Sequence, residues 1–284
     1  ATQTGSEPWE PKNYDGKFEG PMRLRTALVK SKNLISVRIL QAISPQYAQD
    51  YVGRFGFDPK LHPAYLTMAL GAGTVTPLQM ASAYSIFANG GYRVPPYFVE
   101  RVEDARGNVL FEAKPVTAGT GAERVIDARN AFIMSTIMRD VVRAGTATRA
   151  MKLGRGDLAG KTGTTNEFVD AWFCGWGGDL VAIAWIGFDT PQTLGRNETG
   201  AQAALPIWVN YMGPVLKGVP EQALTPPGGV VSLRINPETG LRVSDSSGIV
   251  DYFYQEFLPP EQETLVGGVL GGERPREDVR NQLF

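Results

Sequence analysis

The chain has 284 residues, 43% of them hydrophobic, and its 28 Lys and Arg side chains almost balance its 29 Asp and Glu side chains. This composition predicts a globular protein with one large domain or two modest ones, and a net charge of −1 gives no electrostatic reason to expect nucleic-acid binding. The longest apolar stretch, residues 180–188, has the length of a strand rather than of a membrane span, so we expect no membrane contact by this chain itself.

Single copies of cysteine and histidine restrict the possible chemistry. Cys174 has no partner for a disulfide, and its aromatic neighbours are typical of a buried, unreactive thiol. His62 would have to serve any Ser-His-Asp relay, but no recognisable partner accompanies it, so we interpret it as structural. Zinc sites with two histidines or several cysteines are excluded, and the sequence predicts no metal and no cofactor.

Helical periodicity begins after Pro21. Apolar residues share one face over residues 24–28, and a second helical pattern runs over residues 34–43. Ser31-Lys32-Asn33 is therefore predicted to be a short loop between two helices. A simpler interpretation remains open for this loop, because both Ser31 and Asn33 are good N-caps for the second helix.

Two further helices are predicted before residue 92. The first covers residues 47–55 and ends at Gly56. The second begins at Thr76-Pro77-Leu78-Gln79, which combines a capping Thr, a first-turn Pro and a Gln at the third helical position. The preceding Gly71-Ala72-Gly73-Thr74 lacks the last glycine and the GK[ST] of phosphate-binding loops, so we exclude nucleotide binding.

The middle of the chain alternates between strand and helix patterns. Residues 98–103 and 109–112 predict a hairpin, and residues 127–142 predict a long amphipathic helix that ends at Gly145. The basic residues at and after the end of this helix are expected to form a solvated face: Arg139, Arg143, Arg149, Lys152 and Arg155.

Three strands follow, over residues 158–165, 171–176 and 180–188, and together they predict an antiparallel meander with a helix over residues 205–216 packed across it. The first of them contains Ala159-Gly160-Lys161-Thr162-Gly163-Thr164-Thr165. Threonine favours extended backbone, and an edge strand here would offer free backbone groups to a peptide and the Lys161 ammonium to a carboxylate. A flexible Gly/Thr turn with a solvated lysine is the alternative.

Composition shifts to Pro, Gly and charged residues after Val219. A last hairpin is predicted between residues 230–235 and 241–243, and residues 267–284 are expected to be loose.

The Ser-x-Asn loop and the Lys-Thr-Gly strand, 130 positions apart, follow the order found in serine acyl-transferases that work without histidine. Three further segments resemble class A penicillin-binding proteins of the bifunctional 1A type. They are Trp9-Glu10-Pro11-Lys12-Asn13-Tyr14, residues 70–81, and residues 160–166 leading into Asp170-Ala171-Trp172-Phe173. The resemblance extends from Trp9 to about Pro227.

This resemblance implies the α/β (α+β) fold of serine β-lactamases and penicillin-binding transpeptidases, an antiparallel sheet flanked by helices. It implies a partial transpeptidase domain over residues 1–227, with residues 228–284 as a C-terminal hairpin and extended tail. The implied reaction is acyl transfer from D-Ala-D-Ala stem peptides, which crosslinks peptidoglycan and is blocked by β-lactams. The implied location is the periplasmic side of the inner membrane, with a glycosyltransferase domain and a membrane anchor upstream.

The resemblance also assigns roles to site residues. Ser31 would relay a proton to the leaving amine, Asn33 would orient the substrate amide, and Lys161 would bind the substrate carboxylate while keeping the base lysine neutral. The remaining substrate-binding residues would lie on the same strand, and they are Thr162, Gly163, Thr164 and Thr165, with the backbone N–H of Thr164 in the oxyanion hole.

One part of the family pattern is absent: no Ser or Thr in the chain is followed by Lys three positions later. We expect the nucleophile and its base, S-x-x-K, to lie upstream of Trp9 or on another chain, and this chain alone to be inactive. Two alternatives stay open, a non-catalytic peptidoglycan-binding scaffold and a β-lactamase or DD-carboxypeptidase.

Overall fold

The computed structural model describes residues 9–244 and 246–262. Its centre is an antiparallel sheet of β5 (Ala159–Thr164), β6 (Ala171–Gly177) and β7 (Leu180–Ile186), in that order. Lys161 pairs with Cys174 in the β5–β6 register. The predicted meander is thus confirmed, and β5 lies at the edge of the sheet, as expected.

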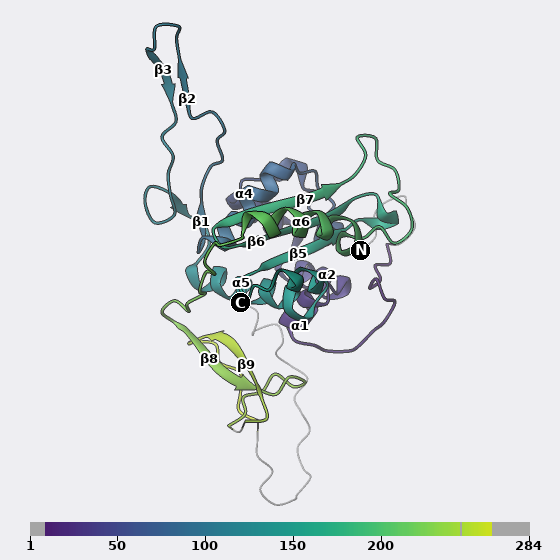
Figure 1. Ribbon diagram of the computed structural model, residues 1–284. Helices are drawn as coiled ribbons and strands as arrows, with labels where there is room; N and C mark the ends of the chain where they lie inside the picture. The colour runs from purple at the N-terminus through teal and green to yellow at the C-terminus, as the bar shows by residue number, and fades with distance from the viewer. Residues whose placement is uncertain (1–8, 245, 263–284) are drawn as a thin grey trace, which may run out of the picture.

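Helices cover both faces of this sheet. Successive side chains of β6 point to opposite faces, so the strand contributes to the packing on both sides. On one face, Phe173 packs edge-on against Trp208 of α6 (Leu205–Val215), at 4.9 Å between ring centroids. On the other face, Trp176 packs against Tyr84 of α4 (Pro77–Ala88), at 6.5 Å. Helix α5 (Ala128–Ala144) runs beside β5, and its Val141 joins Phe173 and Trp208 in the main core (Figure 1).

The N-terminal helices are short and follow one another closely. They are α1 (Leu24–Val29), α2 (Asn33–Ile43) and α3 (Pro45–Val52), followed by 3-10 turns at Gly53–Phe55, Pro59–Leu61 and Leu66–Leu70. The capping box predicted for α4 is confirmed: Thr76 Oγ1 accepts from Gln79 N at 3.2 Å, and Gln79 Oε1 accepts from Thr76 N at 2.8 Å. Other irregular turns lie at Thr148–Leu153, Asn166–Phe168 and Gly200–Ala204, the last a π-helical turn that leads into α6.

A hairpin projects from the body of the molecule (Figure 1). Its strands β2 (Arg101–Glu103) and β3 (Val109–Glu112) pair with each other and are exposed along their whole length. At its base, β1 (Tyr92–Arg93) pairs with β4 (Glu123–Arg124). The hairpin predicted from residues 98–112 is therefore confirmed.

The C-terminal hairpin has a different partner strand from the one predicted. β8 (Val230–Ile235) pairs with β9 (Ile249–Tyr254), whereas Arg242 makes only single bridges, to Ile235 and Glu261. The partner is selected by tertiary contacts that a local pattern does not carry: Asp251 of β9 forms ion pairs of 2.8 and 2.7 Å with Arg23 and Arg25, next to α1 and within it. The predicted loose segment 267–284 lies outside the described residues.

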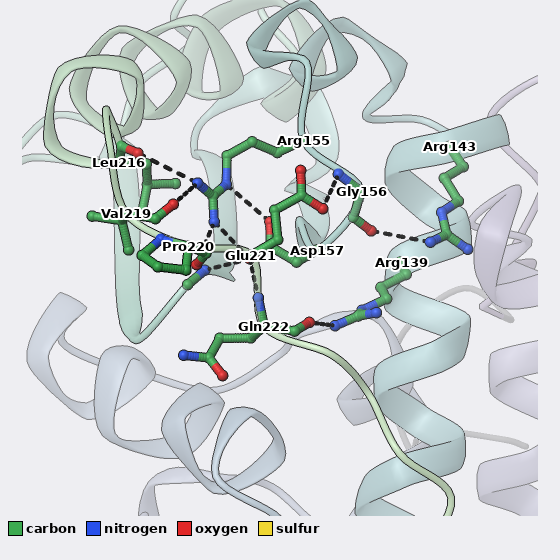
Figure 2. Close-up of polar contacts among 11 residues, drawn as sticks. Arg139, Arg143, Arg155, Gly156, Asp157, Leu216, Val219, Pro220, Glu221 and Gln222 are labelled. Atoms are coloured by element: carbon green, nitrogen blue, oxygen red, sulfur yellow. Dashed lines mark hydrogen bonds and ion pairs between the residues drawn. The ribbon is translucent and has the colours of Figure 1, made fainter.

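The prediction of a uniformly solvated basic face was wrong for two of its arginines. Arg155 is largely buried, where its guanidinium donates to the carboxylate of Asp157 at 2.8 and 2.9 Å and to the carbonyls of Leu216, Val219 and Pro220 (Figure 2). Arg139 lies partly buried and donates to the carbonyl of Gln222 at 2.9 Å. These arginines instead hold the segment after α6 against the sheet and α5.

No helix in the described ranges is long and apolar enough to cross a membrane.

Candidate functional site

A cleft of about 680 Å³ opens between β5 and α4. The edge strand forms one wall, with Lys161 and the three residues after it in the strand. The opposite wall comes from α4 and the segment before it, including Met68, Leu70, Met80 and Tyr84. The cleft thus combines an apolar wall with a polar sheet edge.

Lys161 connects the edge strand to the loop between α1 and α2. Its Nζ lies 2.7 Å from Ser31 Oγ and donates to the Thr162 carbonyl at 3.0 Å. The two motifs, 130 positions apart in the sequence, therefore meet through a direct side-chain hydrogen bond. This is the juxtaposition expected from the Ser-x-Asn and Lys-Thr-Gly pattern.

Among the described residues, the Lys161 ammonium donates to neutral oxygens only, the Ser31 hydroxyl and the Thr162 carbonyl. Burial lowers the pKa of its ammonium to about 8, against an ordinary 10.5, and the neighbouring Cys174 opposes this shift. Burial in turn raises the pKa of the Cys174 thiol to about 12, so the thiol is protonated at neutral pH. At pH 7 Lys161 is therefore still mainly a cation, but one that loses its proton more readily than an exposed lysine.

Ser31 occupies a helix C-terminus in an unusual conformation. Its φ of +55° is left-handed, and the flanking backbone bonds, Ser31 N to Leu28 O at 3.1 Å and Lys32 N to Ala27 O at 2.9 Å, form the Schellman motif that closes α1. Glycine is the usual residue at this position because it lacks a Cβ. Neither Ser31 nor Asn33 caps α2, whose N-cap is Lys32 with no side-chain hydrogen bond, so the simple capping interpretation was wrong.

The hydroxyls of the edge strand are already oriented by neighbours. Thr162 Oγ1 lies 2.7 Å from Thr146 Oγ1, and Thr164 Oγ1 accepts from Gly200 N at 3.0 Å. Thr165 Oγ1 accepts from Asp170 N at 2.7 Å. Because the Thr164 oxygen acts as an acceptor, its own O–H proton is left for a ligand.

A family model of the penicillin binding protein transpeptidase domain matches residues 1–204. The chain belongs to this family. Penicillin-binding protein 1A of Neisseria lactamica is 51% identical over 224 residues, which make up 79% of this chain and 28% of that protein. Penicillin-binding protein 1A of Pseudomonas aeruginosa is 40% identical over an alignment of 317 residues, covering 95% of this chain and 39% of that protein.

Among solved structures, penicillin-binding protein 1A from Haemophilus influenzae superposes with a TM-score of 0.86 at 34% identity, covering 93% of this chain and 44% of that one. The chain thus spans less than half the length of each of these relatives. The likeness confirms the penicillin-binding transpeptidase fold and the 1A type that the motifs indicated.

Not every predicted residue of this transpeptidase family faces the cleft in the same way. The Asn33 amide is turned toward the N-terminal segment, where Nδ2 donates to the Lys12 carbonyl at 2.9 Å. Neither Asn33 nor Ser31 is among the described residues that line the cleft, and Ser31 is joined to it by its contact with Lys161. Gly163 serves close packing, since a Cβ there would lie 3.2 Å from the Cβ of Trp172. Lys161, Thr162, Gly163, Thr164 and Thr165 all line the cleft.

Sequence reasoning missed several residues that support the edge strand. Thr146 orients Thr162, and Asp170 accepts from Trp185 Nε1 at 2.8 Å while its backbone N–H holds Thr165. Gly200 approaches so closely that a Cβ would lie 2.4 Å from the Gly163 carbonyl. Thr146 and Gly200 carry no local signal, because their role comes from contacts with a distant strand.

His62 is buried and packs edge-on against Phe57 at 5.3 Å, next to Gly73, where a Cβ would lie 2.2 Å from the imidazole. This packing agrees with its structural interpretation. Within the described ranges, no three His, Cys, Asp or Glu side chains are placed to hold a metal ion.

Proposed function

We propose that this chain forms the substrate-binding wall of a serine DD-transpeptidase that crosslinks peptidoglycan. The observation that carries the proposal is the 2.7 Å contact between Ser31 Oγ and Nζ of Lys161, a residue that lines the cleft, in a chain of the penicillin-binding transpeptidase family. A histidine-free serine enzyme needs a hydroxyl and an ammonium at this distance to move a proton beside the scissile bond.

The nucleophilic serine gives its proton to the base lysine of S-x-x-K and its oxygen bonds to the carbonyl carbon of the penultimate D-Ala, while the C–N bond to the terminal D-Ala breaks. The amine of a neighbouring stem peptide then bonds to the same carbon, the bond to the serine oxygen breaks, and the amine proton returns to that oxygen through the base lysine. Ser31 Oγ passes a proton to the leaving nitrogen, and Lys161 keeps Ser31 oriented while its positive charge attracts the terminal carboxylate. With a pKa of about 8, Lys161 is cationic enough at neutral pH to hold that carboxylate.

The threonine hydroxyls complete the carboxylate site. Thr164 accepts from Gly200 N and keeps its O–H free to donate, and one hydroxyl of the Thr146–Thr162 pair keeps a proton for the same purpose. The Thr164 N–H is the proposed oxyanion donor, and the loss of such a donor costs about 2.7–4 kcal/mol in a serine protease. Asn33 donates through Nδ2 to the Lys12 carbonyl. For Asn33 the proposal requires that Oδ1 accepts from the substrate amide or the base lysine once the S-x-x-K segment is in place.

The nucleophile and its base, S-x-x-K, come in this proposal from a segment outside these 284 residues or from another chain, because no Ser or Thr here precedes a Lys by three positions. A segment in the cleft between α4 and β5 would meet Lys161, which is hydrogen-bonded to Ser31. We propose that the whole protein also has a glycosyltransferase domain and a membrane anchor, and acts on the periplasmic side of the inner membrane. The first 227 residues would then be part of the transpeptidase domain.

Fluorescent penicillin tests the proposal. The full-length protein should form a covalent adduct on a serine outside this chain, and the 284-residue chain alone should form none. An adduct on one of the chain's own serines would contradict the placement of the nucleophile. A full-length protein that never reacts would favour a non-catalytic scaffold.

Release of the acyl group separates a transpeptidase from a β-lactamase. We expect the full-length protein to release acyl-penicillin slowly, and fast turnover of nitrocefin would contradict the assignment. Replacing Lys161 with Ala should reduce acylation by about 10²–10³-fold, as the loss of a preorganised charge does elsewhere. Lys152→Ala, at an exposed lysine after α5, is the matched control and should acylate normally.

A further inference from the structure

Lys32, the middle residue of Ser31-Lys32-Asn33, is a buried lysine between the two residues with proposed roles. Only 5% of its surface is exposed, and its ammonium lies 2.7 Å from Asp15 Oδ2 and 2.7 Å from Glu19 Oε2. Hydrogen bonds to Asp15 and then to Glu19 raise the pKa of Lys32, so it stays charged at any physiological pH. A lysine on the exposed surface of a loop is solvated by water, whereas the buried ammonium of Lys32 has its charge compensated by these two carboxylates.

The carboxylates belong to an N-terminal segment that contacts this loop at several points. Asn13 Oδ1 accepts from Leu34 N at 3.1 Å, and thereby satisfies a free N–H in the first turn of α2. The Asn33 amide donates to the Lys12 carbonyl at 2.9 Å. The ion pairs of Lys32 with Asp15 and Glu19 add to these two contacts, so residues 12–19 contact the loop at Lys32, Asn33 and Leu34.

The other side of the loop carries the functional contact. Ser31 must keep its left-handed backbone, with φ of +55°, to present Oγ to Lys161 at 2.7 Å. A non-glycine residue in this region costs about 1–3 kcal/mol and persists only where its surroundings impose it. The backbone bonds from Ser31 and Lys32 to α1 supply part of that constraint, and the buried ammonium of Lys32 supplies an anchor one residue away.

We propose that Lys32 is a positioning residue of the transpeptidase: by binding Asp15 and Glu19 it holds the loop in the conformation that places Ser31 Oγ against Lys161. This inference rests on the proposed function for its effect on catalysis, but the conformational part stands independently of it. Lys32 touches no reacting atom and acts only through the backbone of Ser31.

The test uses the full-length protein and Lys32→Met, with Lys30→Met as the matched control. Lys30 lies two residues away and is 52% exposed, with one 3.6 Å contact to Glu19. Lys32→Met should lower the first-order rate of acylation by penicillin about 10- to 100-fold, because a displaced Ser31 no longer relays the proton. The dissociation constant of the non-covalent complex should change little, and Lys30→Met should behave as the unaltered protein.

A triple variant, Lys32→Met with Asp15→Asn and Glu19→Gln, separates positioning from a purely structural role. It removes the two carboxylates that the single variant leaves without their cation, so the unfolding temperature should recover. Acylation should stay at least 10-fold slow. Recovery of acylation together with stability would overturn the inference, as would unchanged acylation in Lys32→Met.

Hydrogen exchange of the backbone amides of residues 31, 32 and 34 tests whether Lys32 holds the loop, and it needs no reaction with penicillin. Exchange should be faster in Lys32→Met and in the triple variant and unchanged in Lys30→Met. Unchanged exchange in Lys32→Met would overturn the inference whether or not penicillin reacts. Faster exchange in Lys32→Met would support the conformational role even if penicillin never labelled the unaltered protein. That combination of results would contradict only the proposed function.

Discussion

Two buried charges near the start of the edge strand differ in how their neighbours compensate them. Asp157 lies two residues before β5 and is 2% exposed, and Lys161 is the third residue of the strand. Burial would raise the pKa of Asp157, yet hydrogen bonds from Arg155 and from the N–H groups of Gln222 and Gly178 bring it below its ordinary value. The negative charge of the buried aspartate is therefore compensated by the Arg155 guanidinium and by backbone N–H donors (Figure 2).

Lys161 has no such compensation among the described residues. Its ammonium donates to a hydroxyl and a carbonyl, and no salt bridge reaches it, so burial dominates and lowers its pKa to about 8. Neutralising Lys161 with a carboxylate would favour the folded state but would occupy the cation. Asp157 therefore stabilises the fold, whereas the uncompensated charge of Lys161 agrees with the ligand-binding role that we propose for it.

The largest expected effect comes from removing the compensated charge. Asp157→Asn leaves the Arg155 guanidinium buried without its carboxylate, and should lower the free energy of unfolding by about 3–5 kcal/mol. Urea unfolding measures this loss. Asp179→Asn, at an exposed aspartate in the next turn, is the matched control. Equal stability of the two variants would show that the carbonyls around Arg155 suffice.

A smaller and pH-dependent effect is expected at the uncompensated charge. The pKa of Lys161 is about 8 in the folded chain, against the ordinary lysine value of 10.5 that we take for the unfolded chain. Between these two pH values the unfolded chain binds more protons than the folded chain. The free energy of unfolding therefore rises with pH across that window. Lys161→Met lacks this titration. Its stability relative to the unaltered chain should be most favourable below pH 8 and should fall by about 1–3 kcal/mol towards pH 10.5.

Urea unfolding at several pH values checks this slope. Lys217→Met, which removes an exposed lysine after α6, is the control for the loss of a lysine as such. A pH dependence of Lys161→Met no steeper than that of Lys217→Met would mean that the Lys161 ammonium is solvated.

The smallest effect is expected beside Lys161, at the hydroxyl pair of Thr146 and Thr162. Thr146→Val removes one partner of the 2.7 Å contact and should cost about 1 kcal/mol of unfolding free energy. Thr148→Val, at an exposed position two residues later, is the control. A loss no larger than in the control would indicate that Thr162 finds another partner.

Much of the fold was predictable because its signals are local. The capping box of α4, the meander of β5 to β7 and the projecting hairpin each follow from periodicity and turn residues within short segments. The candidate site was predictable for a different reason, since Ser31 and Lys161 carry motifs whose residue types the chemistry requires. Their contact then agreed with the expected juxtaposition.

Two of the errors share one physical cause. The wrong partner for β8 and the solvated face assigned to Arg139 and Arg155 both depended on segments far away in the chain. Such contacts are selected by which groups can be buried together, and no periodicity records that choice.

The sequence by itself determined the family, the order of the elements and the chemical types present at the cleft, because these depend on short patterns. Only the tertiary structure decided which charges are compensated. Asp15 and Glu19 at Lys32, and Arg155 at Asp157, are found only when the chain is folded. Lys161 is distinguished from other lysines in the same way, since a pKa responds to burial and to neighbouring charges rather than to the residue name.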